Sequence, residues 1–343
     1  MPESKYSISG IKNGISILFF YHEKGEAMPN REVPINLEEQ IDVIKKYVVF
    51  RQRKRMRDFL QYAGYFRVSR YGKYLLSYSG IMGNKPKQNL LFQLYEFDVK
   101  LRNLLVLYCN KAEVRFKSAV SNAVSIKTQD ADFYLNQQYY TPSKSEKDAK
   151  KRKRNEKYFQ RFLDDISEKE NALRKDVVKH PELKEYRKGG SRQNSSLPVW
   201  VAFSYFEFGT ITMLYSYLRG DLRKDVLNYA FSKGKYKKEA TKQVDTWLDA
   251  IRNLRNYCAH NSMVSGMTSS VVIRDLNDSA DVLPKDTDLF SRLYALKKIL
   301  PRKDSEQMKK ELKKLIQRTK FDIYQLNILP QDWENLIDQI EEF

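Results

Sequence analysis

The feature that most constrains this chain is a long segment, from position 90 to 125, that contains neither proline nor glycine. Apolar side chains recur in it at the spacing of an amphipathic helix: Leu94, Phe97, Leu101, Leu104, Tyr108, Ala112, Phe116 and Ala119. At ~1.5 Å per residue, about 36 helical residues make a rod of ~50 Å. The pattern predicts that this is the central helix of the fold. The helix is long enough that it could contain a break or a kink.

Helical spacing recurs through most of the remaining chain, so the sequence predicts an all-α protein. Changes in composition divide it into an N-terminal arm (1–36), an N-terminal helical part (37–140), a basic insertion or linker (141–196), a second helical part (197–265) and a C-terminal helical extension (266–343). A chain of 343 residues with 41% apolar side chains can form one large core or two lobes.

Helix-breaking residues and apolar runs set further local expectations. A helix that begins near Leu37 is expected to continue to Leu60 and to end at Gly64. The basic insertion is expected to hold a short helix around 158–163, and residues 271–273 are a candidate strand. Later helices are expected at 222–232, 239–262, 288–300, 304–319 and 331–342.

The net charge of +19, with a pI of about 9.6, attracts anions to the whole surface. Nucleic acid is the commonest partner for such a charge, and a lysine-rich protein kept soluble by its charge is the alternative. Cys109 and Cys258 fit neither a disulfide framework nor a zinc site, and buried thiols are expected. No apolar run has the length of a membrane span or a signal segment, so we expect a cytoplasmic protein that does not contact a membrane. We also expect it to use neither a cofactor nor a metal.

The segment best suited to chemistry is 247–260, Trp-Leu-Asp-Ala-Ile-Arg-Asn-Leu-Arg-Asn-Tyr-Cys-Ala-His. At about 100° per residue its apolar residues form a narrow stripe, whereas Arg255, Asn256 and His260 fan across the opposite face. Asn256 and His260 share a side of the helix, but Arg255 and His260 point about 140° apart. One helix alone therefore makes an incomplete site from these residues.

Arginine, asparagine and histidine suit the cleavage of RNA, in which the 2′-OH attacks the neighbouring phosphorus without an external nucleophile. Histidine moves protons near neutral pH, and arginine stabilises the charge that develops on a phosphate. The products would be a 2′,3′-cyclic phosphate and a 5′-OH. The alternative is an exposed polar helix face on which Arg255 and His260 only complement the C-terminal end of the helix dipole.

Several blocks of the chain resemble those of the AbiD/AbiF abortive-infection family, in the family's order. Residues 64–71, Gly-Tyr-Phe-Arg-Val-Ser-Arg-Tyr, resemble its Gly-Tyr-Tyr-Arg-Leu-Ser-Gly-Tyr block, and residues 94–102 resemble its Leu-Tyr-x-Phe-Asp-x-x-Leu-Arg block. Residues 198–200 and 208–210 resemble its Pro-x-Trp and Phe-Gly-x-Leu stretch, and residues 254–260 are similar to its Leu-Arg-Asn-x-Cys-Ala-His. The resemblance covers roughly residues 40–265.

This resemblance implies a HEPN-type helical bundle with a long central helix. It also implies a metal-independent endoribonuclease with Arg255, Asn256 and His260 as catalytic residues, and a homodimer in which two motifs form one composite site. The implied role is that of an abortive-infection or toxin effector in phage defence or a toxin–antitoxin system. The chain departs from the family after the motif, where Asn261 replaces a second histidine and 263–266 replace a tail containing Arg and Trp.

Basic residues close to aromatic ones are the expected RNA contacts, because cations pair with phosphates and aromatic faces stack on unpaired bases. The candidates are Arg51, Arg53, Lys54, Arg55, Tyr65, Arg67, Arg70, Tyr71 and Arg252. For the aromatic residues among them, the alternative is burial in the core. The RNA is expected to be a substrate, a regulatory small RNA or both.

Two further functions stay open on the sequence alone. One is a non-catalytic RNA-binding protein of the HEPN fold, bound to or regulated by a small non-coding RNA. The other is an interaction protein whose partner is another protein. If the protein is an enzyme, substitution of His260 abolishes RNA cleavage, and this result distinguishes it from the non-catalytic RNA-binding protein. Nucleic acid that purifies with the protein argues against the interaction protein.

Overall fold

The structure is a computed structural model that describes residues 34–82, 84–141, 148–176, 178–231, 240–273 and 283–340. Within these ranges the chain contains no strand, and β-type pairing is limited to isolated bridges between Val49 and Lys87 and between Tyr140 and Leu218. The predicted all-α class is therefore confirmed. The α-helices are α1 (Leu37–Ile44), α2 (Arg53–Ala63), α3 (Tyr65–Ser77), α4 (Ser79–Met82), α5 (Gln88–Thr128), α6 (Ala149–Lys175), α7 (Val199–Tyr205), α8 (Phe208–Tyr217), α9 (Gly220–Ala230), α10 (Ala240–Ala259), α11 (Leu289–Ile299), α12 (Arg302–Gln317) and α13 (Trp333–Gln339). Short 3-10 helices lie at η1 (Phe133–Leu135), η2 (Gln137–Tyr139) and η3 (Pro181–Tyr186).

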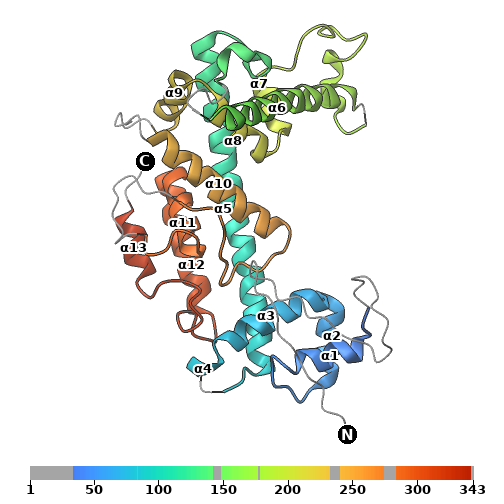
Figure 1. Ribbon diagram of the computed structural model, residues 1–343, viewed down its shortest axis with the longest axis vertical. Coiled ribbons are helices and arrows are strands. Elements are labelled where there is room, and N and C mark those ends of the chain that lie inside the picture. The colour runs from blue at the N-terminus through green and yellow to red at the C-terminus, as the bar shows by residue number, and fades with distance from the viewer. Residues whose placement is uncertain are drawn as a thin grey trace.

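Helix α5 runs through the length of the molecule and is its spine (Figure 1). It has 41 residues, which correspond to a rod of about 60 Å at ~1.5 Å per residue. The helix predicted for 90–125 is confirmed and extends further at both ends. Its apolar stripe is buried apart from the half-buried Leu104, and α3, α7, α8, α9, α10, α11 and α12 all pack against it.

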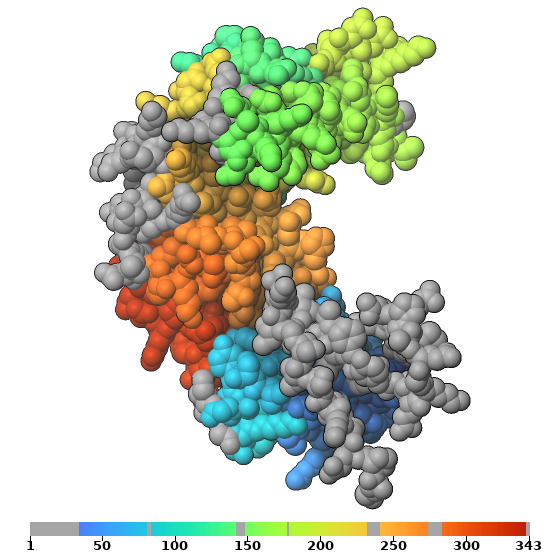
Figure 2. All heavy atoms as spheres, in the orientation of Figure 1, coloured from blue at the N-terminus to red at the C-terminus, as the bar shows by residue number. Residues whose placement is uncertain are grey.

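The other helices form three groups along the length of α5 (Figure 1). Helices α1–α3 lie at one end, α10–α13 lie along the middle, and α6–α9 lie at the other end, where α6 runs across the direction of α5. The N-terminal helices and α6 project to the same side, and the C-terminal end of α10 lies between them. In Figure 2 the part that contains α6, in green, projects beyond the surface that α10 forms, in orange.

The basic insertion holds a longer helix than expected. The sequence predicts a short helix around 158–163, whereas α6 has 27 residues. Its first two turns carry almost no apolar side chains, which is why the apolar pattern stops short of its true beginning. Further along, the buried carboxylate of Glu170 accepts the backbone N–H of Leu197 at 2.9 Å and ties α6 to the segment before α7.

Two other local expectations are corrected. The helix predicted from Leu37 to Leu60 is broken into α1 and α2, because the backbone of Val49 pairs with that of Pro86 and of Gln88 at the beginning of α5, at 2.8 and 2.9 Å. Residues 271–273 form no strand. Gly64, with φ of 80°, ends α2 as predicted, and the later predicted helices correspond to α9, α10, α11, α12 and α13. The expected N-terminal arm lies outside the described residues up to position 33.

Candidate functional site

The candidate catalytic residues Arg255, Asn256 and His260, called the motif below, lie at the C-terminal end of α10. The predicted apolar stripe of this helix is buried against the core through Trp247, Ile251, Leu254 and Cys258. On the opposite side, Asn256 and His260 are exposed and the side chain of Arg255 is 41% exposed. The stripe thus anchors the helix on α5 and α11, while the three polar side chains stay accessible from solvent.

His260 is the first residue beyond α10, and the chain turns sharply after it. The backbone N–H of Asn261 donates to the carbonyl of Cys258 at 3.1 Å, and that of Ser262 donates to the carbonyl of Tyr257 at 2.8 Å. Asn261 has a φ of 53°, in the left-handed region. These bonds define a Schellman motif, in which asparagine is one of the few residues besides glycine that adopts this conformation readily. Asn261 therefore has a structural role, because it ends the helix directly after His260.

Arg255 faces a carboxylate of α5. Its Nε lies 4.0 Å from Oε2 of Glu113, whose Oε1 lies 2.7 Å from Nζ of Lys117. Lys117 also donates to the carbonyl of Phe206 at 2.5 Å, so this cation holds Glu113 in place. Among the described residues Arg255 forms no hydrogen bond, which leaves its guanidinium donors available to an anion.

A buried carboxylate on α5 fixes the segment that follows the motif. Oδ1 of Asp98 accepts the backbone N–H groups of Val264 and Ser265 at 3.0 and 2.6 Å. Oδ2 accepts the hydroxyl of Tyr71 at 2.6 Å and pairs with Arg102, which also donates to that hydroxyl at 2.9 Å. Asp98 is completely buried and Arg102 nearly so, and the two charges compensate each other in this hydrogen-bonded network.

This network joins three of the sequence blocks that carry the family resemblance. The block at 64–71 supplies Tyr71, the block at 94–102 supplies Asp98 and Arg102, and the block at 254–260 leads into the segment that Asp98 holds. Sequence reasoning missed this role of Asp98. The available signal was its spacing of four residues from Arg102, which places opposite charges side by side next to the apolar stripe.

Cys109 and Cys258 are buried free thiols, as predicted. Burial raises the pKa of the Cys258 thiol to about 12, and the negative charge of Asp98 acts in the same direction. Burial likewise raises the pKa of Cys109 well above its usual range. Both side chains therefore stay protonated at neutral pH and act as small apolar groups in the packing of α5 and α10.

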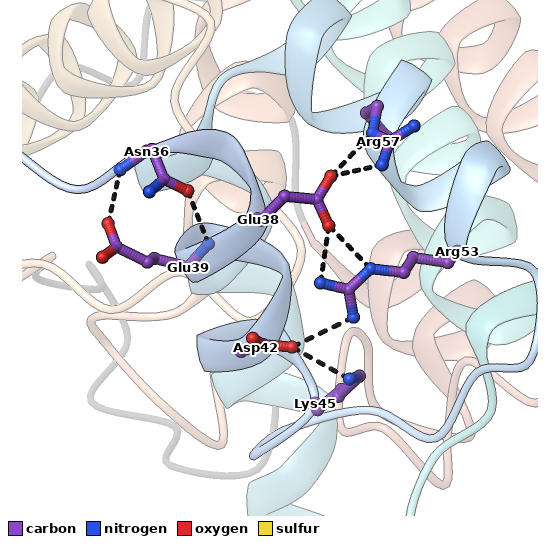
Figure 3. Close-up of polar contacts among 7 residues, drawn as sticks. All are labelled: Asn36, Glu38, Glu39, Asp42, Lys45, Arg53 and Arg57. Carbon is purple, nitrogen blue, oxygen red and sulfur yellow. Dashed lines mark hydrogen bonds and ion pairs between the residues drawn. The ribbon is translucent and has the colours of Figure 1, made fainter.

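The basic run at 51–57, predicted to bind RNA, is partly used inside the protein (Figure 3). Glu38 of α1 accepts a hydrogen bond from Nε of Arg53 at 2.7 Å and also pairs with Arg57. Asp42 accepts from Arg53 at 3.1 Å. The hydrogen bonds from Arg57 and Arg53 lower the pKa of Glu38. Arg53 thus holds α2 against α1 while part of its side chain stays exposed, and its contact with RNA stays a prediction.

The other members of that run, Arg51, Lys54 and Arg55, are exposed. The guanidinium of Arg55 lies 4.5 Å from the ring centre of Phe92 on α5, a cation–π arrangement. These three residues keep the exposure that contact with RNA requires.

The remaining candidates differ in exposure. Arg70 is exposed, and Arg67 and Tyr65 are half-buried on α3. Tyr71 is corrected to the core alternative, because its ring is fully buried and its hydroxyl is bound to Asp98. Arg252 is half-buried on α10, and it pairs with Asp249 one turn earlier at 2.9 Å.

Within the described ranges, no group of three or more His, Cys, Asp or Glu side chains is placed to hold a metal ion. No helix in the same part of the chain is both long and apolar enough to cross a membrane. His180, the other histidine that the structure describes, packs against the ring of Tyr205 with 4.6 Å between ring centres and belongs to a different part of the fold.

The fold and the site define a class of all-helical proteins in which an Arg-Asn-x-x-x-His sequence closes a helix that packs on a long central helix. The sequence model of the Abi-like protein family matches residues 58–265, more than half of the chain, and the protein belongs to this family. The expected family resemblance is thereby confirmed, and the family connects the protein with abortive infection, a form of phage defence. No curated protein and no solved structure matches the chain.

Proposed function

We propose that this protein is a metal-independent endoribonuclease of the HEPN type that acts as an abortive-infection or toxin effector in phage defence. The observation that carries the proposal is the placement of Arg255, Asn256 and His260 at one accessible helix end whose backbone is fixed on both sides of the turn. The Schellman motif at Asn261 fixes the position of His260, and Asp98 fixes the segment that follows. A charge-stabilising site depends on such preorganisation.

The proposed reaction needs only groups of the protein and of the RNA. An imidazole takes the proton of the 2′-OH as O2′ forms a bond to the adjacent phosphorus, and the bond from phosphorus to O5′ breaks. A second acid gives a proton to O5′, which leaves as a 5′-OH. Arg255 stabilises the charge on the non-bridging phosphate oxygens, and Asn256 orients the phosphate or the imidazole.

A homodimer supplies the second acid in this scheme. Arg255 and His260 point about 140° apart on an ideal helix, so one phosphate does not meet both side chains of the same chain in line. A twofold axis near the end of α10 brings the arginine of one chain to the histidine of its copy, and it also brings two histidines to one phosphodiester. The exposure of Asn256 and His260 supports such an arrangement.

One observation favours a second candidate function, a non-catalytic RNA-binding protein that is bound to or regulated by a small non-coding RNA. Nε of Arg255 lies 4.0 Å from Glu113, and Lys117 holds that carboxylate in place. Part of the charge of Arg255 is therefore balanced within the protein, as expected if this arginine serves the structure and not a reaction.

Cleavage of single-stranded RNA by the purified protein in the presence of EDTA tests the proposal. We expect products with 2′,3′-cyclic phosphate and 5′-OH ends, loss of cleavage in His260→Ala, and full cleavage in the control His180→Ala. The toxicity of the expressed protein should disappear with the same variant. Cleavage that survives in His260→Ala rejects the assignment, and RNA binding without cleavage by any form supports the second candidate.

A further inference from the structure

A groove of about 530 Å³ lies between α2 and the first half of α5. Its volume falls within the range of small-ligand sites in proteins, about 300–1,000 Å³. It lies apart from the motif, and no residue of the motif lines it. The proposed cleavage site leaves this groove without a role.

Aromatic rings form much of the groove. The ring centre of Phe59 lies 4.7 Å from that of Phe92 and 5.0 Å from that of Tyr95, both in edge-to-face contact. These rings support one another, whereas the ring of Tyr62 at the groove is 81% exposed. An aromatic ring of this exposure, next to a rigid aromatic wall, offers a face on which a planar group can stack.

The charges around the rings are of both signs. Arg55 and Lys100 bring exposed cations to the groove, and Asp58 and Glu96 bring exposed carboxylates. A simple phosphate track would be lined by cations alone. A nucleotide matches the mixed set, because its phosphate pairs with a cation while carboxylates accept hydrogen bonds from amino groups on the edge of its base.

We propose that this groove binds unpaired bases of single-stranded RNA. The inference rests on the proposed function and adds to it a binding site away from the cleaved bond. Bases within a duplex are stacked on their neighbours and present no free face, so the groove selects single strands.

The surface of α5 connects the groove with the motif. Beyond Lys100, exposed residues recur on the same side of the helix at Asn103, Leu107, Asn110 and Val114. Glu113, the neighbour of Arg255, follows Lys100 by thirteen residues, or about 20 Å at ~1.5 Å per residue. Helix α2 and the C-terminal end of α10 also lie on the same side of α5 (Figure 1). A single strand with bases in the groove would have to span at least this length of α5, about 20 Å, to bring another of its phosphates to Arg255.

The test measures the binding of a fluorescein-labelled, mixed-sequence RNA of about 12 nucleotides to the full-length His260→Ala protein by fluorescence anisotropy. We expect Tyr62→Ala and Lys100→Ala each to weaken binding about tenfold, through loss of a stacked base or of a phosphate contact. The matched controls Tyr229→Ala and Lys224→Ala make the same changes at exposed positions of α9 and should bind as the parent does. Circular dichroism checks that every variant is folded.

Three outcomes overturn the inference in distinguishable ways. Equal affinity for all four variants, together with RNA cleavage by the unaltered protein, rejects the groove and leaves the proposed function intact. An equal loss of affinity for double-stranded RNA of the same sequence would show that the groove does not select unpaired bases. Neither binding nor cleavage by any form rejects both, and a protein partner then becomes the occupant to seek. Photocrosslinks from 4-thiouridine to peptides of α2 and α5 would support the inference directly.

Discussion

Oδ1 of Asp98 accepts the backbone N–H of Ser265 at 2.6 Å, and these two residues are 167 positions apart in the sequence. The bond connects the central helix with the segment that follows His260. Asp98 is therefore a positioning residue, since it faces the core and acts on the motif through the backbone. Its partners are Arg102, four residues later on α5, and Tyr71 of α3, and together the three side chains form a buried network.

Substitution Asp98→Asn should destabilise the protein by about 3–5 kcal/mol, because it leaves the buried cation of Arg102 without its carboxylate. Urea unfolding followed by circular dichroism measures this loss. The control Asp58→Asn, at an exposed position of α2, should change the free energy of unfolding by less than ~0.5 kcal/mol. An equally small change in Asp98→Asn would show that the network does not stabilise the fold.

At Asn261, glycine should be tolerated and valine should not. The residue has a φ of 53°, and a β-branched side chain in the left-handed region costs roughly 1–2 kcal/mol. Thermal melts should therefore show a lower Tm for Asn261→Val than for Asn261→Gly. Equal melting temperatures for the two variants would contradict a role of Asn261 in ending α10.

Mixing the unaltered protein with an equal amount of His260→Ala should inhibit cleavage if the site is shared between chains. The proposed reaction takes one histidine from each chain, so a mixed dimer lacks either the base or the acid and is inactive. Random exchange leaves roughly a quarter of the dimers with two unaltered chains, so cleavage should fall to about a quarter of that of the same total amount of unaltered protein. Cleavage is measured after the two proteins are mixed and allowed to exchange, with unaltered protein diluted to half its concentration as control. Cleavage equal to that of the control, in a sample shown to contain mixed dimers, would argue for a site within one chain.

The thiols of Cys109 and Cys258 should resist alkylation in the folded protein. The pKa of Cys258 is raised to about 12, so the reactive thiolate is about a ten-thousandth of the total at pH 8. The rate of reaction with iodoacetamide should therefore be low at pH 8 and rise as the pH approaches 12 while the fold persists. Denatured protein is the control, in which both thiols react at the rate of ordinary cysteine. Fast labelling of the folded protein at pH 8 would contradict the burial of these side chains.

Local patterns predicted the parts of this fold that depend on a residue and its near neighbours. The apolar stripe of α5 and that of α10 follow from the helical period, and both are buried as predicted. The break at 45–52 escaped prediction because it depends on backbone pairing of Val49 with Pro86 and Gln88. The full length of α6 was not predicted, because its exposed first turns carry almost no apolar side chains.

For the candidate site, the sequence by itself determined that Arg255, Asn256 and His260 avoid the apolar stripe of their helix, and it predicted these three residues as the reactive groups. Only the tertiary structure decided what surrounds them. It placed Glu113 beside Arg255 and Asp98 beneath the segment after His260, and it used Arg53 to hold two helices together. The physical reason is that helical periodicity is a property of neighbouring residues, whereas charge pairing and burial of polar groups are settled between segments that meet only when the chain is packed.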